Sequence, residues 1–351
     1  KQQLWKMISS KYQYLIYHTT PSSMKHSQPE DFEFLLKKRL DEQRKLRQRF
    51  EYKASVKWDD VKGLQEAKDT LKEVLILPAK FPQLFVGRRR SPWQGILLYG
   101  PPGCGKTFLA KAFSSEFCGT FLYVNSVDLV SKWAGESEKT VRQLFTLARS
   151  MRPCVIFIDE IDVLCDSDGY ARRVYTELLV NMQSVNNTDV FVIVATNSPW
   201  NLSSGVKRRL EKTIYVGMPD KEARSAIIAK EVSHTAHTIT KEQFNALGEA
   251  SVGYSCSDIC SFVRDACMEP VREIQKATHF RKVPVGETFE WRSCSSMDEG
   301  AVAMTWQDIP ESEHNKLKVR ELTVDDVLNS IRKSRPSVKD QDVARCIEAF
   351  S

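Results

Sequence analysis

The sequence lacks long apolar runs and paired cysteines. Its longest aliphatic stretches, such as Val190–Ala195, are far shorter than the ~18 residues that cross a bilayer, and no secretory leader opens it. The nine cysteines form no CxxC pair, and His234 and His237 have no cysteine or acidic partner at ligand spacing. These absences argue against a membrane span, a disulfide framework and a zinc site. They predict an intracellular protein whose cysteines are reduced packing residues.

The chain also lacks an even spread of charge. Of its 351 residues, 51 are Lys or Arg and 45 are Asp or Glu. Residues 1–53 hold 12 of these cations and 6 of these anions, which leaves 39 against 39 elsewhere. The basic segment is either a solvated linker helix, which we favour, or a contact for an acidic membrane or nucleic acid. The length itself suggests two or three domains at ~100–200 residues each.

A glycine-rich turn follows the apolar run Ile96–Tyr99. Residues Gly100–Thr107 read GPPGCGKT, which matches the phosphate-binding loop pattern GxxxxGK[ST]. Its glycines let successive N–H groups point into one concavity, at the positive end of the helix that follows. Lys106 is then expected on the β- and γ-phosphates and the Thr107 hydroxyl on Mg²⁺. The alternative is a plain glycine-rich turn. The phosphate-binding loop is favoured, because it requires a strand before it and a helix after it, and both patterns are present.

Short β-rich runs alternate with helical patterns up to Pro219. The expected strands are Ile96–Tyr99, Thr120–Asn125, Val155–Ile158, Val190–Ala195 and Ile214–Val216. Such alternation predicts an α/β fold with a parallel sheet covered by helices on both faces.

Polar residues end two of these strands. Asp159 and Glu160 follow the run Val155–Ile158, and we expect Asp159 to hold Mg²⁺ and Glu160 to activate the attacking water. Asn197 follows Val190–Ala195 and is either a turn former or a second residue that positions this water. An acidic strand end facing solvent is the alternative for the two carboxylates.

Two further patterns stay open on the residues alone. Arg208 and Arg209 are either a solvated basic turn or arginine fingers for a neighbouring subunit's γ-phosphate. Lys132 and Trp133 precede an amphipathic helix. The indole is either half-buried or an exposed grip for an extended peptide.

The C-terminal third changes character. Helices are expected over 221–233, 240–250 and 257–277, followed by an inserted β excursion near 281–320. Thr323 with Asp326 predicts a capped helix start, and Ser337 with Asp340 predicts another. At the other end of the chain, residues 31–50 read as a helix that ends before the first domain.

With these pieces in this order, the chain resembles the AAA ATPases over roughly residues 54–351. Within them it is similar to the meiotic clade of katanin, spastin and fidgetin, and most similar to the branch that disassembles ESCRT polymers. The β insertion separates it from katanin-like members. The motifs that carry the resemblance are Trp58–Leu64, Ile76–Pro82, Gly100–Thr107, Ser131–Leu144, Ile156–Asp162, Ala195–Asn197, Cys267–Phe280, Met304–Trp306 and Ser334–Val338.

The resemblance implies roles for these residues. By this resemblance, Asp159 would hold the metal and Glu160 would be the catalytic base. Asn197 would be the first sensor residue, and Arg208 and Arg209 would be the arginine fingers. Lys132 and Trp133 become the first pore loop of a hexameric ring. The nucleotide contacts it implies are Asp60, Val61, Pro101, Pro102, Gly103, Cys104, Gly105, Lys106, Thr107, Phe108 and Cys256.

Some positions depart from the family pattern. Cys104 stands for the usual threonine, Cys256 for a glycine and Leu210 for a phenylalanine. The segment Cys165–Ala171 is shorter than the family's second pore loop. The segment before residue 54 is too short for the family's three-helix recruitment domain.

We therefore expect an AAA+ P-loop NTPase with a basic linker (1–53), a large α/β subdomain (54–219), a small helical subdomain (220–335) with its β insertion, and a C-terminal helix (336–351). With ATP and Mg²⁺ it would form a homo-hexamer and pull ESCRT subunits through a pore. It would be cytoplasmic, recruited to endosomal membrane, with a cofactor protein at the insertion and no nucleic-acid partner. The alternatives are a microtubule-severing ATPase and a binding module without hydrolysis.

Overall fold

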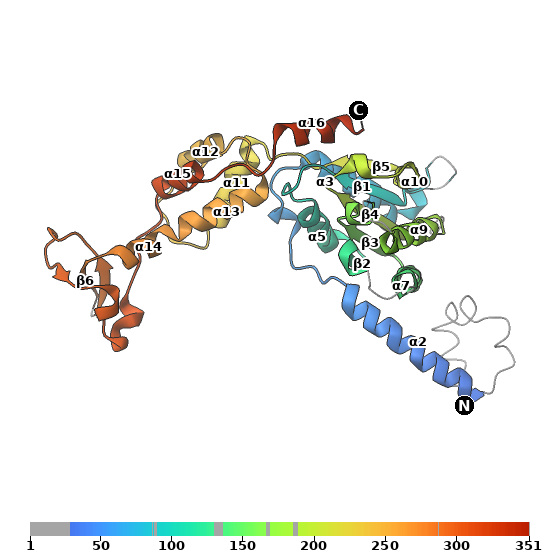
Figure 1. Ribbon diagram of the computed structural model, residues 1–351, viewed down its shortest axis with the longest axis horizontal. Coiled ribbons are helices and arrows are strands. Elements are labelled where there is room, and N and C mark those ends of the chain that lie inside the picture. Colours follow the sequence, from blue (N-terminus) through green and yellow to red (C-terminus); the bar gives the residue numbers. More distant parts are fainter. Residues whose placement is uncertain are drawn as a thin grey trace.

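The computed structural model describes residues 29–85, 87, 90–129, 136–165, 169–184, 189–286 and 288–350. The molecule is elongated: an α/β unit is followed by a helical unit, and a small β unit forms the far end (Figure 1). Helix α2 (Pro29–Phe50) projects from the α/β unit. It confirms the helix predicted over residues 31–50. Among the described residues, no helix is long and apolar enough to span a bilayer.

A five-stranded sheet forms the centre of the α/β unit. Its order is β2-β3-β4-β1-β5, and every neighbouring pair is parallel. The predicted parallel sheet is thereby confirmed, and the carboxyl ends of all five strands lie at one edge. The strands are β1 (Gly95–Tyr99), β2 (Thr120–Asn125), β3 (Cys154–Asp159), β4 (Val190–Thr196) and β5 (Lys212–Tyr215).

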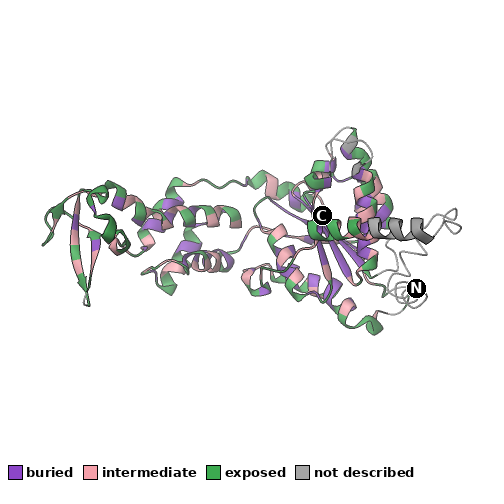
Figure 2. Ribbon diagram, turned by 90° about the horizontal axis from the view of Figure 1, so that it is seen from below, coloured by how far each residue is buried: buried purple, intermediate pink, exposed green. Residues whose placement is uncertain are grey.

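Apolar layers cover both faces of the sheet, because side chains alternate along each strand. Ile156 and Ile158 of β3 pack in the layer that contains α7 and α9. Val155 and Phe157 pack in the opposite layer with α5. Figure 2 shows the strands as a buried fan with helices on both sides. The helices of the unit are α5 (Lys106–Glu116), α6 (Ser126–Leu129), α7 (Glu136–Ser150), α8 (Asp162–Cys165), α9 (Tyr170–Gln183) and α10 (Ser204–Lys207).

Short helical pieces lead into β1. Pro78 lies in the first turn of the last α-helical piece, where its missing N–H leaves no intrahelical hydrogen bond unmade. The pieces are the 3₁₀ turn Trp58–Asp60, α3 (Gln65–Leu71), a π-helical stretch Lys72–Ile76, α4 (Leu77–Lys80) and the 3₁₀ turn Pro82–Leu84.

The helical unit has its own core, in which Leu247, Phe262 and Val327 are buried. The single helix predicted over 257–277 is wrong, because the chain forms two helices that meet at Met268. Pro270 causes the break: it has no N–H, and its ring clashes with the carbonyl four residues earlier. The helices are α11 (Lys221–Val232), α12 (Lys241–Ala250), α13 (Cys256–Cys267), α14 (Glu269–Lys276) and α15 (Val324–Lys333).

The predicted β excursion is confirmed between α14 and α15. Strands β6 (His279–Val285), β7 (Thr288–Ser293) and β8 (Val302–Ala303) form an antiparallel sheet in the order β7-β6-β8. Phe280 and Trp291 are buried in a small core of this unit.

Helix α16 (Asp340–Glu348) returns to the α/β unit, where the Phe350 ring lies 4.7 Å from that of Tyr99 (Figure 1). The start predicted from Ser337 is wrong, since Lys339 precedes the helix. The Ser337 hydroxyl instead donates to Asp258 Oδ2 at 3.0 Å. The capping box predicted for Thr323 and Asp326 is confirmed at the start of α15.

Candidate active site

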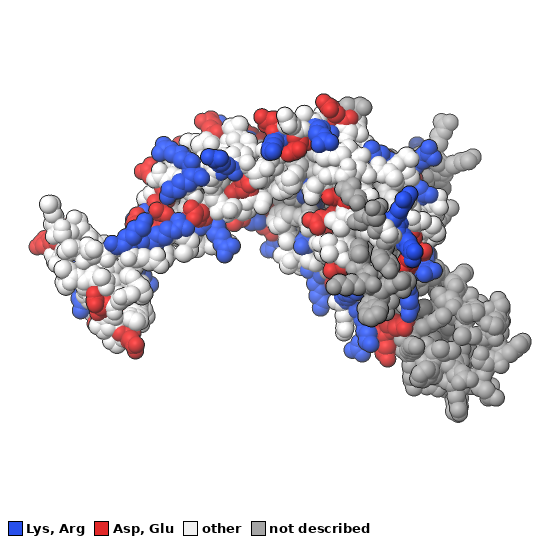
Figure 3. Space-filling view, viewed as in Figure 1, with Lys and Arg blue, Asp and Glu red and all other residues white. Residues whose placement is uncertain are grey.

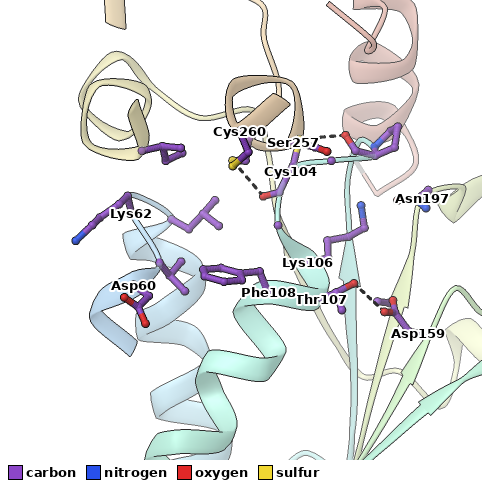
Figure 4. Close-up of a pocket in the computed structure, with 18 of the residues that line it drawn as sticks. Asp60, Lys62, Cys104, Lys106, Thr107, Phe108, Asp159, Asn197, Ser257 and Cys260 are labelled. Carbon is purple, nitrogen blue, oxygen red and sulfur yellow. Dashed lines mark hydrogen bonds between the residues drawn. The ribbon is translucent and has the colours of Figure 1, made fainter. Parts of the chain in front are cut away.

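One cavity of about 530 Å³ opens at the carboxyl edge of the sheet (Figure 4). Its wall combines the turn after β1, the ends of β3 and β4, the 3₁₀ turn at Asp60, and helices α11 and α13. The residues that line it are Asp60, Val61, Lys62, Leu64, Pro102, Gly103, Cys104, Gly105, Lys106, Thr107, Phe108, Asp159, Glu160, Ala195, Thr196, Asn197, Ile227, Lys230, Glu231, Cys256, Ser257 and Cys260.

The turn after β1 has a backbone that glycine alone adopts easily. Gly103 and Gly105 have φ of +74° and +95°. A Cβ on Gly100 would lie 2.1 Å from the Val216 carbonyl oxygen, and one on Gly103 would lie 2.7 Å from Ser255 Oγ. Helix α5 begins directly afterwards, so its free N–H groups face the same concavity. This geometry suits an anion such as a phosphate chain.

Lys106 places a cation beneath this turn. Its side chain is 7% exposed, and Nζ donates to the carbonyl oxygens of Gly100 and Pro101, each at 2.8 Å. Burial lowers the pKa of Lys106, because the ammonium has lost part of its hydration. Pro101, which was expected to contact the nucleotide, is buried and does not line the cavity.

The Thr107 hydroxyl and the Asp159 carboxylate meet at the end of β3. Thr107 Oγ1 donates to Asp159 Oδ2 at 2.7 Å, and the Tyr123 hydroxyl donates to the same oxygen at 3.2 Å. The Ser126 hydroxyl donates a hydrogen bond to the Asp159 carbonyl oxygen at 2.7 Å. Burial, and then the charge of Asp159, raises the pKa of Tyr123 to about 12, so the phenol stays a donor. A hydroxyl beside a buried carboxylate is the hard oxygen donor set that fits Mg²⁺.

Glu160 differs from its buried neighbour. It is exposed to the cavity and has a positive φ of +53°, which is unfavourable for a residue with a side chain. Its N–H donates to Asp159 Oδ1 at 3.1 Å. Asn197, at the end of β4, lines the same cavity and is half-buried. The structure thus brings together the carboxylates and the amide that the strand ends predicted.

Cys104 and Cys256, the two cysteines that depart from the family pattern near the nucleotide, both line the cavity. Cys104 is fully buried, and Cys256 Sγ lies 3.8 Å from the Cys104 carbonyl oxygen. Burial raises the pKa of Cys104 to about 11 and that of Cys256 to about 12, so both are neutral thiols at pH 7. All nine cysteines are free.

Sequence reasoning missed the contribution of α11 to this cavity. Ile227, Lys230 and Glu231 line it from the helical unit, and Lys230 Nζ lies 3.0 Å from Asp60 Oδ1. The pattern of α11 carries no signal for this, because its polar residues read as an ordinary solvated helix face.

Comparisons with known proteins agree with this geometry. The family model "ATPase family associated with various cellular activities (AAA)" matches residues 96–218, and "Vps4 C terminal oligomerisation domain" matches residues 291–350. The chain is 46% identical over 310 residues to vacuolar protein sorting-associated protein 4 of Dictyostelium discoideum. That alignment covers 84% of this chain and 69% of the relative.

The chain belongs to the AAA ATPase family, in the vacuolar protein sorting-associated protein 4 group. It is therefore an ATP-hydrolysing enzyme that binds nucleotide and forms oligomers.

The chain is also similar to other AAA ATPases. The crystal structure of the FIGL-1 AAA domain superimposes with a TM-score of 0.71 at 31% identity, covering 94% of this chain and 97% of that one. The katanin p60 ATPase-containing subunit A1 of Arabidopsis thaliana is 46% identical, but over 62% of this chain and 44% of its own length.

Two pairs of residues expected in an AAA ATPase lie outside the cavity or outside the described residues. Arg208 is exposed at the end of α10, and Arg209 Nη1 donates to the Gly205 carbonyl at 2.6 Å. Neither lines the cavity of its own chain. Lys132 and Trp133, the predicted pore loop, lie outside the described residues.

Proposed function

We propose that this AAA ATPase binds Mg²⁺·ATP in the cavity, hydrolyses it as a homo-hexameric ring, and thereby disassembles ESCRT polymers. One observation carries the proposal: the chain that forms the cavity continues into residues 291–350, which begin within the β insertion and match the Vps4 oligomerisation domain. A microtubule-severing activity is less supported, because the katanin similarity spans less of the chain than the similarity to the sorting proteins.

The cavity residues divide the work of hydrolysis. The N–H groups of the glycine turn and Lys106 hold the phosphates, which positions the γ-phosphoryl group for in-line attack. Thr107 and Asp159 would hold Mg²⁺, which neutralises charge on the phosphate oxygens when bound. Glu160, exposed to the cavity, takes a proton from the attacking water, and Asn197 orients that water by its amide.

The fingers act between subunits. Arg208 and Arg209 do not line their own chain's cavity, so each pair would stabilise the charge that develops on a neighbour's phosphates. Lys132 and Trp133 would then grip an extended substrate segment in the central pore. A cofactor protein would bind the β insertion, and recruitment to endosomal membrane would bring the cytoplasmic ring to its polymer.

The test compares preassembled ESCRT filaments and stabilised microtubules side by side with Mg²⁺·ATP. We expect phosphate release together with filament disassembly, and intact microtubules. Glu160→Gln is the matched control for hydrolysis-independent effects and should leave filaments intact. Severed microtubules with intact filaments would support the katanin-type alternative. Binding of ATP without phosphate release would contradict the enzyme assignment.

A further inference from the structure

The helical unit contacts the α/β unit at two different sides of the cavity. On the side of the glycine turn, the Ser257 N–H donates to the Gly103 carbonyl oxygen at 3.1 Å. On the other side, Lys230 of α11 forms an ion pair with Asp60 of the 3₁₀ turn. Figure 4 shows Ser257 and Asp60 on separate walls of the cavity. A molecule bound in the cavity would therefore lie between two bridges.

Lys230 makes three contacts across this gap. Its Nζ lies 3.0 Å from Asp60 Oδ1 and 3.4 Å from the Asp60 carbonyl oxygen, and it lies 5.5 Å from the centre of the Phe108 ring. Asp60 is fixed in turn, because its Oδ2 accepts from the Lys57 N–H at 2.8 Å. Phe108 follows Thr107 in α5. Lys230 thus connects the helical unit to both the Asp60 turn and the first turn of the phosphate-binding helix.

The position of this pair matters more than its strength. The two side chains are 34% and 33% exposed, and an exposed pair changes an equilibrium by only about 2- to 5-fold. The hydrogen bond from Lys230 is the largest cause of the lowered pKa of Asp60, so the carboxylate is charged at neutral pH. The pair joins the helical unit to the α/β unit and does not stabilise the fold of either one. Its small interaction energy therefore shifts the equilibrium between relative positions of the two units.

We propose that Lys230 is a positioning residue for the nucleotide: by holding the Asp60 turn against α11, it keeps that side of the cavity closed and lengthens the residence of bound nucleotide. This inference rests on the proposed nucleotide site. It assigns to α11 a role that no sequence motif of the chain carries.

Lys230→Met tests the proposal, since methionine keeps an apolar stem and removes the charge. Lys221→Met is the matched control, because Lys221 lies on the same helix and pairs with Glu249, away from the cavity. Dissociation of fluorescent ADP should be about 2- to 5-fold faster in Lys230→Met than in wild type, and unchanged in Lys221→Met. The difference should shrink in ~1 M salt, which screens the pair.

A second readout needs no nucleotide. The amides of Asp60 and Val61 donate to the carbonyls of Lys57 and Trp58 at 3.0 and 3.3 Å. Their hydrogen exchange should be faster in Lys230→Met and unchanged in Lys221→Met. Wild-type exchange and wild-type ADP dissociation in Lys230→Met would overturn the proposal. Failure of wild type to bind ADP would instead count against the proposed function, and the exchange comparison would still decide the role of Lys230.

A double-mutant cycle separates the bridge from a direct contact with nucleotide. Asp60→Asn removes the charge but keeps an oxygen for the Lys57 N–H. If the two residues act through each other, the double variant Asp60→Asn/Lys230→Met should release ADP no faster than either single variant. If the fold-increases in ADP dissociation of the two single variants multiply in the double variant, each residue acts on the nucleotide separately. That result would overturn the proposed role of the Lys230–Asp60 pair.

Discussion

At the level of single residues, Asp159 and Glu160 are adjacent in sequence but differ in environment. Asp159 is 6% exposed and accepts hydrogen bonds from Thr107 and Tyr123, whereas Glu160 is exposed to the cavity with a positive φ. The environment of Asp159 suits a rigidly held Mg²⁺ ligand, and that of Glu160 suits a general base that must contact a water molecule. Their substitutions should therefore separate binding from chemistry.

Glu160→Gln should bind ATP normally and lose at least ~100-fold in turnover, because the amide keeps the size of the side chain but accepts no proton. Phosphate release and ATP retention measure the two effects. Glu116→Gln, at the exposed end of α5, serves as the control and should behave like wild type. Turnover within a few-fold of wild type in Glu160→Gln would reject its role as base.

Lys106→Ala should instead weaken ATP binding by about 10-fold or more, the effect of losing a hydrogen bond to a charged group. Lys111→Ala is its control, since Lys111 lies on the same helix but over the Tyr123 ring, 4.7 Å from its centre. Titration with a fluorescent ATP analogue measures both variants. Equal affinity in wild type and Lys106→Ala would contradict the phosphate-loop assignment.

At the level of elements, an ion-pair network fixes the start of α15 to α14. Arg320 donates to both Asp326 oxygens, at 2.6 and 2.7 Å, and to Glu273 at 2.5 and 2.7 Å. Burial alone would raise the pKa of Asp326, but the hydrogen bonds from Arg320 and Thr323 together lower it. Arg320 lies just after the β unit, so the network anchors the exit of the insertion.

This network predicts a pH dependence. A carboxylate whose folded pKa is lowered stabilises the fold above its unfolded pKa of ~3.9, and that contribution disappears as pH falls through the folded pKa. Asp326→Asn should therefore lower the melting temperature at pH 7, and its difference from wild type should shrink below about pH 4. Asp325→Asn, an exposed neighbour, is the control. A difference that is constant between pH 7 and pH 3 would contradict the assignment.

The C-terminal helix predicts a second effect at this scale. The Phe350 ring packs on Tyr99, and the Lys207 ammonium lies 5.2 Å from its centre. Phe350→Ala should lower stability by about 1–2 kcal/mol, since aromatic pairs contribute ~0.5–1.5 kcal/mol beyond burial. Ile347→Ala, at a side chain of α16 that is 52% exposed, should have a smaller effect. Thermal unfolding compares the two, and equal melting temperatures would mean that α16 does not stabilise the α/β unit.

At the level of the whole molecule, the proposed arginine fingers would complete a neighbour's cavity, so a monomer should not turn over ATP. Activity should rise steeply with protein concentration. Arg208→Ala and Arg209→Ala should bind nucleotide and lose turnover by roughly 10³-fold, the effect of an arginine finger. Lys207→Ala is the control. It removes a positive charge one residue before Arg208, so it tests whether turnover depends on the position of the cation and not only on the net charge. Normal turnover in both single variants and the double variant would reject the fingers.

The proposed pore loop predicts a defect in substrate coupling that is separate from ATP hydrolysis. Trp133→Ala should hydrolyse ATP and melt like wild type, yet fail to disassemble ESCRT filaments. A buried Trp→Ala change would instead lower stability by ~3–5 kcal/mol. Thermal unfolding and filament assays on the same preparation distinguish the two. A large drop in melting temperature would place Trp133 in the core instead of the pore.

The sequence alone determined the parts of this protein that depend on local chemistry. Gly100–Thr107 needs glycine where the backbone has positive φ, and β3 needs an apolar run because both its faces are buried. These demands act over a few residues, so they leave a pattern in the residue types themselves. The glycine turn, the five strands and the acidic strand end were therefore predictable from that pattern.

Only the tertiary structure decided the contacts between distant segments. Lys230 and Asp60 are 170 residues apart, and Ser337 and Asp258 are 79 apart. In sequence, Lys230 is one more polar residue on a helix face, and Ser337 fits a helix cap as well as it fits a distant carboxylate. Such partners depend on how completed helices pack, and many arrangements bury the same apolar face. The packing of the helical unit over the cavity is therefore decided by the fold and not by any local pattern.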